Sequence, residues 1–161
     1  MVTEIEVNVT ERCLLVSALI CCIGRGKAPI TFILDTGAEV TSLSESDLNK
    51  MGLSTSDLPH SSKTMMGISG KPGQTFEMDN AVLLFQCSNK PGKAYEHHID
   101  TIQVLQKQEI KDQHKTKNGA KIVIHRESKI PSLLGFDFFK QTNATLTIDF
   151  KNISGKIIIE D

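Results

Sequence analysis

The chain carries almost no net charge: its formal charge at pH 7 is −1 over 161 residues. This balance gives no reason to expect binding to nucleic acid or to an anionic membrane surface. The apolar run Leu14–Ile23 is too short to span a bilayer, and the acidic start of the chain lacks the basic region of a signal peptide. We therefore expect by default a cytoplasmic protein without membrane insertion, and release from a larger precursor is the alternative.

Signatures of metal and nucleotide sites are also missing. The four cysteines, Cys13, Cys21, Cys22 and Cys87, do not follow a metal-ligand spacing. Gly70-Lys71-Pro72 is not a phosphate-binding loop, because proline stands where Ser or Thr is needed and the preceding glycine spacing is absent. We expect no metal and no cofactor.

Long helical patterns and tandem repeats are absent as well. The chain instead contains many short apolar runs of strand length separated by turn residues, which indicates an all-β barrel. One short helix is predicted after Ser44–Asp47, where helix-start residues precede Leu48, and Gly52 supplies a stop. The length fits one domain over residues 1–161 with a sizeable core.

One polar stretch, residues 106–127, fits this pattern poorly. We interpret it as an insertion within the domain, forming a hairpin that turns at Asn118-Gly119 and returns over Lys121–His125. It is either a loop that selects substrate or a solvated excursion from the fold.

The most informative motif is Asp35-Thr36-Gly37-Ala38, which follows the apolar run Ile30–Leu34 and occurs once. It has two interpretations. A strand can end in a turn where Asp accepts backbone hydrogen bonds and Gly provides conformational freedom. Alternatively, the strand presents Asp35 as a catalytic carboxylate.

Three blocks in sequence favour the catalytic interpretation: Phe32–Ala38, Gly67–Gly70 and Leu133–Asp137. In this order they resemble the retropepsin-like aspartic proteases, which include retroviral proteases, ubiquitin-linked proteases and small prokaryotic relatives. The resemblance covers roughly residues 14–159. It implies a closed acid-protease β-barrel of a single lobe, with one or two short helices, that is active as a symmetric homodimer.

The chemistry explains why one motif is not enough. Two carboxylates about 3 Å apart cannot both ionise, so they share one proton, and aspartic proteases are the standard example of this. The charged carboxylate accepts a proton from the attacking water, while the protonated one donates a hydrogen bond to the substrate carbonyl. No second Asp-Thr/Ser-Gly occurs in the chain. We therefore expect Asp35 from each of two subunits to form the pair, with an interface that includes the active-site loops and Leu146–Ile159.

The resemblance assigns roles to the neighbours of Asp35. Thr36 is expected to hydrogen-bond across the dimer axis, and Gly37 allows backbone to approach the carboxylate and the substrate. Ala38 stands where pepsin-like enzymes usually have Ser, so no hydroxyl stabilises the charged form. We therefore expect a working range near about pH 5–6. Glu39 occupies the acidic position that contacts substrate backbone. In many viral members an Arg pairs with this acidic residue, but this chain has Phe136 at the place of that Arg.

A long peptide in a cleft needs main-chain hydrogen bonds from both sides, and a mobile hairpin supplies the upper side. The segment Lys63–Phe76 is a glycine-tipped hairpin that fits this flap, with Gly67, Ile68 and Ser69 in contact with substrate. An ordinary surface hairpin is the plainer interpretation.

Two functions remain from the sequence. The first is an aspartic endopeptidase that cuts extended polypeptides and binds pepstatin-type or peptidomimetic inhibitors. The second is a catalytically weak retropepsin-like module for dimerisation or peptide binding. The intact Asp35-Thr36-Gly37 favours the enzyme, because a binding module has no need for paired carboxylates.

Overall fold

The computed structural model describes residues 1–66, 72–127 and 130–160. The chain folds mainly into strands because apolar and polar residues alternate along it, which places one face of each strand in the core. The strands of the main sheet are β1 (Val2–Val9), β2 (Leu14–Cys22), β3 (Gly26–Leu34), β4 (Ser42–Ser44), β7 (Thr75–Gln86), β8 (Ala94–Leu105), β11 (Leu133–Leu134), β12 (Thr145–Asp149) and β13 (Ser154–Glu160).

Six of these strands close into a barrel in the order β2-β3-β11-β4-β8-β7. The ring closes because β2 pairs with β3 on one side and with β7 on the other, so that Leu19 lies opposite both Pro29 and Leu84. The all-β barrel predicted from the sequence is confirmed. Strands β7 and β8 are longer than the runs Ala81–Phe85 and Ile99–Leu105 that suggested them.

The core fills the barrel with side chains from alternate strand positions. Phe32, Phe85, Ile20, Met78 and Leu83 are among those fully shielded from solvent. Each buried side chain of this size stabilises the fold by about 1.5–3 kcal/mol through removal of apolar surface from water.

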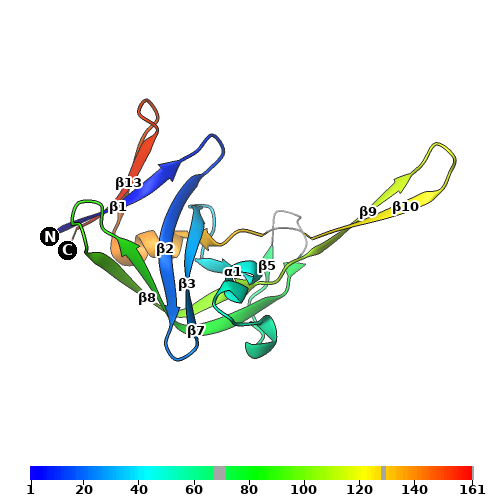
Figure 1. Cartoon of the computed structure of the whole chain (residues 1–161), viewed down its shortest axis with the longest axis horizontal. Helices are drawn as coiled ribbons and strands as arrows, with labels where there is room; N and C mark the ends of the chain where they lie inside the picture. The colour runs from blue at the N-terminus through cyan, green and yellow to red at the C-terminus, as the bar shows by residue number, and fades with distance from the viewer. Residues whose placement is uncertain (67–71, 128–129, 161) are drawn as a thin grey trace.

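The remaining strands, β1, β13 and β12, extend the sheet beyond β2. β1 and β13 pair along their lengths, with Val2 opposite Glu160, so the two ends of the chain lie side by side (Figure 1). Ile157 and Ile159 are buried, and β13 is covered by β1 on one side and β12 on the other. The apolar run Ile157–Ile159 is therefore an inner strand of the sheet rather than an exposed edge.

Two α-helices cover the barrel, α1 (Glu45–Lys50) and α2 (Phe136–Thr142), and a 3₁₀ turn, η1, spans Thr55–Asp57. Ser44 caps α1 by accepting a hydrogen bond from the backbone N–H of Asp47, as the helix-start residues predicted. Gly52 follows with φ +77°, a left-handed conformation suited to the end of a helix. Neither these helices nor any other within the described residues is long and apolar enough to cross a membrane.

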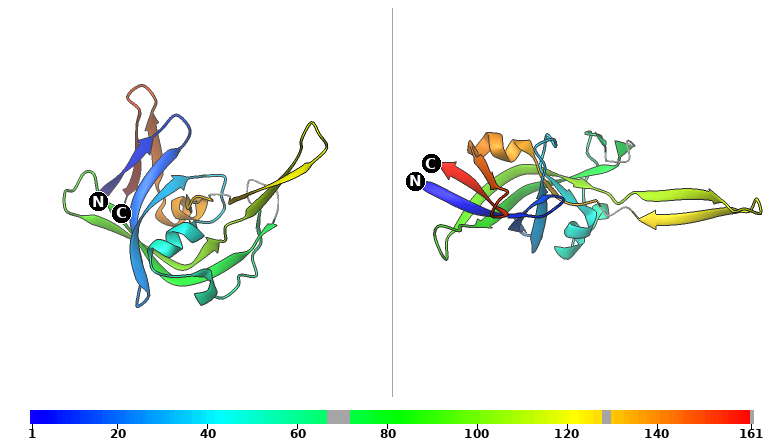
Figure 2. Two further views of the ribbon diagram at one scale, coloured as in Figure 1. Left: turned by 45° about the vertical axis from the view of Figure 1, so that its right-hand side comes forward. Right: turned by 90° about the horizontal axis from the view of Figure 1, so that it is seen from above.

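Two hairpins stand apart from the barrel sheet. β5 (Met65–Met66) and β6 (Pro72–Gly73) pair at the position predicted for the flap. β9 (Glu109–Lys115) and β10 (Lys121–Glu127) form a separate antiparallel pair that projects from the body, here called the arm (Figures 1 and 2). The arm turns at Asn118-Gly119, where Gly119 has φ +78°, as predicted from the sequence. Its status as an insertion stays a prediction.

Candidate active site

Asp35 lies immediately after β3, at the end of a barrel strand. Its backbone N–H donates to the carbonyl of Leu134 at 3.1 Å, continuing the parallel pairing of β3 with β11. Its own carbonyl accepts a hydrogen bond from the N–H of Ala38 at 3.1 Å, which closes a tight turn. Two strands that are far apart in the sequence thus fix the backbone of this aspartate.

The carboxylate of Asp35 is held at the surface of the turn. The backbone N–H of Gly37 donates to Asp35 Oδ1 at 2.9 Å, and the residue is half-buried. A Cβ on Gly37 would lie 3.1 Å from the same oxygen, so glycine leaves room around the carboxylate. Thr36 and Gly37 are exposed. The side chain of Thr36 has no hydrogen-bond partner among the residues that the structure describes.

The backbone of the next two residues is held by the start of α2. The N–H of Phe136 donates to the carbonyl of Ala38 at 2.8 Å, and that of Asp137 donates to the carbonyl of Glu39 at 3.2 Å. The first N–H groups of a helix have no partner inside the helix, so these bonds satisfy both segments. The Glu39 side chain is exposed and no described residue pairs with it.

A partly buried polar network, which the sequence did not reveal, anchors the loop. Asp137 Oδ1 accepts from the backbone N–H of Thr41 at 2.9 Å and from its hydroxyl at 2.7 Å. The same hydroxyl accepts from the N–H of Gly135 at 3.0 Å. Asp137 lies in the first turn of α2, where the helix dipole favours negative charge. A threonine and an aspartate 96 positions apart give no signal of this pairing in one sequence.

Close backbone packing adds to that anchor. A Cβ on Gly135 would lie 2.4 Å from the carbonyl carbon of Val40 and 2.7 Å from the nitrogen of Thr41. No side chain fits there, which explains the glycine after Leu134 in physical terms. The strand β11, the helix α2 and the loop that carries Asp35 approach one another at this point.

A second buried contact ties α1 to the segment before β11. The Ser132 hydroxyl donates to Asp47 Oδ2 at 2.6 Å and accepts from the Ser44 N–H at 2.9 Å. Lys50 pairs with the other oxygen of Asp47 at 2.6 Å. Ser132 also offers its carbonyl to the N–H of Ile33 at 2.9 Å, so this brace reaches the strand that carries Asp35.

His97 lies behind α2, with its ring edge-on to Phe138 at 4.9 Å between centroids. Burial lowers the pKa of His97, the carboxylate of Asp137 opposes that effect, and His98 adds to it. The neutral imidazole is therefore favoured in the folded protein.

The predicted flap residues Gly67, Ile68 and Ser69 lie outside the described residues. The structure thus brings Asp35, Thr36, Gly37, Ala38 and Glu39 together in one loop, and it describes the stem of the flap hairpin only. Within the described residues no group of three or more His, Cys, Asp or Glu side chains could jointly hold a metal ion.

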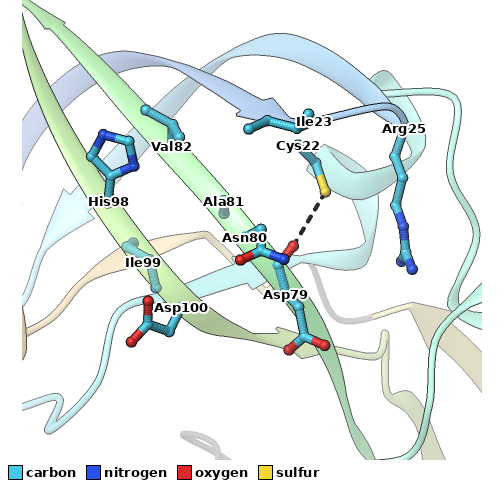
Figure 3. A pocket seen from close by; sticks show the side chains of 10 residues that line it. All are labelled: Cys22, Ile23, Arg25, Asp79, Asn80, Ala81, Val82, His98, Ile99 and Asp100. Carbon is cyan, nitrogen blue, oxygen red and sulfur yellow. Dashed lines mark hydrogen bonds between the residues drawn. The ribbon is translucent and has the colours of Figure 1, made fainter.

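A surface cavity of about 390 Å³ opens elsewhere on the barrel, between the end of β2 and the β7–β8 pair (Figure 3). Its lining includes Cys22, Arg25, Asp79 and His98, and the Cys22 thiol donates to the Asp79 carbonyl at 3.4 Å. None of the predicted site residues lines it. The cavity lies near the start of β3, whereas Asp35 follows the end of β3. A strand of this length spans more than about 20 Å, so the cavity is separate from Asp35.

The comparisons agree with this geometry. Residues 20–79 match the family model described as Aspartyl protease, and this range includes Asp35. The fold is similar to the crystal structure of a retropepsin-like aspartic protease from Rickettsia conorii, with a TM-score of 0.54 and 16% sequence identity. That match covers 99% of this chain and 93% of the other. No curated protein matches the sequence.

Proposed function

We propose that this chain, whose barrel has the retropepsin-like fold and whose residues 20–79 match the aspartyl protease family model, is an aspartic endopeptidase that acts as a homodimer. One observation carries the proposal. Asp35 follows a barrel strand in a turn where the backbone N–H of Gly37 donates to its carboxylate at 2.9 Å, and two segments distant in the sequence hold the loop by backbone hydrogen bonds. A turn built only to reverse the chain has no need of such support.

The reaction follows from pairing two copies of this loop. One Asp35 carboxylate removes a proton from a water molecule, which attacks the peptide carbonyl. The other, protonated, Asp35 donates a hydrogen bond to the carbonyl oxygen and stabilises the charge that develops there. The two groups titrate as a coupled pair rather than separately.

The homodimer supplies the second carboxylate, since each barrel carries a single Asp-Thr-Gly. In this arrangement the exposed Thr36 of each subunit hydrogen-bonds across the two-fold axis. The interface extends to the β12–β13 hairpin, where Phe150 and Ile153 are 77% and 67% exposed. Large apolar side chains exposed on a hairpin beside an edge strand favour burial against a partner.

The substrate is an extended polypeptide that lies between the catalytic loops and the flap hairpins. Main-chain pairing to the loop residues and to Gly67, Ile68 and Ser69 holds it, with Glu39 and Ala38 beside the scissile region. Because Ala38 offers no hydroxyl to the charged carboxylate, activity is expected near about pH 5–6. A cytoplasmic site of action, or release from a longer precursor, is part of the same proposal.

The test is cleavage of unfolded casein from about pH 3.5 to about 7, with sedimentation in the same buffers. Asp35→Asn should reduce cleavage by on the order of 10³-fold or more, because it removes both members of the pair. The matched control is Asp100→Asn, an exposed aspartate on β8 that should leave cleavage unchanged. Full activity of Asp35→Asn, or cleavage by a monomer, would refute the proposal.

A pepstatin-type inhibitor separates the enzyme from the alternative, a catalytically weak binding module. A working pair of carboxylates binds a transition-state mimic far more tightly than a plain peptide of the same side chains. Equal affinity for both ligands would favour the binding module.

A further inference from the structure

The arm is built differently from the rest of the chain. β9 and β10 pair with each other and lie outside the barrel sheet, and every residue of β10 is exposed. The pair projects well away from the barrel along the longest axis of the molecule (Figures 1 and 2). An arm this exposed contributes little to the core, so its sequence is free to serve binding.

Charge on the arm has one sign near its tip. Residues 107–127 contain six basic and three acidic residues, whereas the whole chain has a net charge of −1, so the rest of the chain is net acidic. Two ion pairs use acidic residues nearer the base: Lys107 with Glu127 at 3.6 Å and Arg126 with Asp112 at 3.4 Å. Residues 113–123 contain lysines but no Asp or Glu.

The pairing register places Lys111, Lys115 and Lys121 on a single face. Lys115 lies directly opposite Lys121, and Lys111, four positions before Lys115, lies opposite His125 on the same face. Like charges directly opposite each other, as at Lys115 and Lys121, destabilise a hairpin. A face arranged in this way gains stability when an anionic partner covers it.

The opposite face of β10 carries Ile122 and Ile124, which are 47% and 38% exposed. Val123 on the basic face is 45% exposed. Exposed aliphatic side chains of this kind favour a partner with apolar groups of its own. Residues 107–127 contain no Phe, Tyr or Trp on which bases could stack, and this disfavours single-stranded nucleic acid.

The base of the arm touches the stem of the flap hairpin. A Cβ on Gly73 in β6 would lie 2.7 Å from Gln108 Nε2, so the two segments are in close contact. The N–H of Gln106 donates to the Gln74 carbonyl at 3.3 Å, and that of Lys107 donates to Glu45 Oε2 at 2.9 Å. A polypeptide lying along the arm is therefore led toward the flap.

We propose that the arm is a docking element for an extended, acidic segment of the substrate polypeptide, in which carboxylates alternate with aliphatic residues. The carboxylates pair with Lys111, Lys115 and Lys121, and the backbone pairs with an edge of the arm as an added strand. This inference rests on the proposed protease function for the identity of the partner, but docking itself is measurable without catalysis.

The experiment measures binding by fluorescence anisotropy in the Asp35→Asn protein, where cleavage does not consume the probe. The probe is a labelled dodecapeptide of alternating Glu and Val. The triple variant K111E/K115E/K121E should weaken binding by at least about tenfold, and added salt should weaken binding to the parent protein. The matched control K27E/K93E/K151E changes the net charge equally, but at exposed lysines of the body, and should change affinity less than about twofold.

Several results would overturn the proposal. Equal losses in the two triple variants would mean that net charge alone attracts the peptide. Tighter arm-dependent binding of a labelled oligonucleotide would assign the surface to nucleic acid. A change in sedimentation with the arm variant alone would assign it to a second copy of the chain. A milder variant, K111Q/K115Q/K121Q, guards against misfolding and should give an intermediate loss.

Activity assays keep this result apart from the proposed function. If the protein cleaves acidic substrates, the arm variants should raise KM and leave kcat unchanged, because the arm does not touch the reacting bond. Peptide binding without any cleavage would support docking while refuting the protease. Cleavage in which neither peptide binding nor KM depends on the arm would support the protease and refute docking.

Discussion

The Asp35 loop and the arm are both excursions from the same barrel, yet they are held in opposite ways. The loop that carries Asp35 makes backbone contacts to β11 and α2, and a partly buried Thr41–Asp137 pair holds it from behind. The arm is anchored at its base, and every residue of its strand β10 is exposed. Chemistry needs atoms fixed to a fraction of an ångström, whereas recruitment of a flexible chain needs reach and charge.

Phe138 offers the largest test of this difference. It is fully buried in α2 against Phe85, His97 and Phe139. Phe138→Ala should lower the free energy of unfolding by about 3–5 kcal/mol, because it removes apolar contacts and leaves a cavity. Ile124→Ala on the arm should cost less than about 1 kcal/mol. Urea unfolding at one fixed protein concentration measures both, and equal losses would contradict the division between anchored site and open arm.

Gly135→Ala tests the close approach of backbones behind the Asp35 loop. Its Cβ would lie 2.4 Å from the backbone of Val40, so the loop must shift. We expect a loss of about 2–3 kcal/mol and a large loss of cleavage.

Gly119→Ala at the arm turn is the matched control. Its φ of +78° strains alanine, but no atom lies within 4 Å of the added Cβ. A cost of about 1–2 kcal/mol confined to the arm, with cleavage of casein preserved, is the expected outcome. Lost cleavage in this variant would show that the arm turn shapes the active site.

Thr41→Val removes a hydroxyl and keeps the shape of the side chain. The partly buried Asp137 carboxylate then loses one donor, and the buried Gly135 N–H loses its acceptor. We expect about 1–3 kcal/mol of destabilisation. Because the change displaces the loop and leaves the substrate contacts in place, kcat should fall by a larger factor than KM rises. An unchanged kcat would mean that the network supports stability alone.

His97 gives the smallest effect, on the pH dependence of stability. Burial lowers its pKa below the ordinary value of 6.5, so the unfolded chain binds the proton more readily than the folded one. Its contribution is present above about pH 6.5 and is lost as the pH falls toward the folded pKa. His97→Gln should therefore flatten the decline in unfolding free energy between about pH 7 and about pH 5.

The adjacent His98, whose side chain is 71% exposed, is the control for this measurement. His98→Gln should flatten the pH profile only slightly, because burial, and not His98, is the main cause of the lowered His97 pKa. An equally flattened profile in His98→Gln, or an unchanged one in His97→Gln, would contradict the assignment. The window overlaps the proposed working range near about pH 5–6, so activity there is expected at some cost in stability.

The sequence predicted those strands, caps and turns that depend on a few neighbouring residues. The apolar run Leu14–Ile23, the cap at Ser44 and the Asn118-Gly119 turn each act over a few residues, and the structure has a strand, a helix start and a hairpin turn at these places. The retropepsin-like resemblance was also visible, because its blocks are short motifs in a fixed order. By contrast, the Thr41–Asp137 pair and the contacts of Ser132 join residues 85 or more positions apart. Short motifs do not report such pairs in a single sequence.

The sequence by itself therefore determined the barrel-forming strands, the single Asp-Thr-Gly and the excess of positive charge in the arm. These are properties of residue type and short-range order, which chain topology does not alter. Only the tertiary structure decided that β2 closes the ring with β7, that α2 holds the Asp35 loop and that the base of the arm meets the β5–β6 pair. Those relations depend on which distant surfaces bury each other, and that is settled by packing of the whole chain at once.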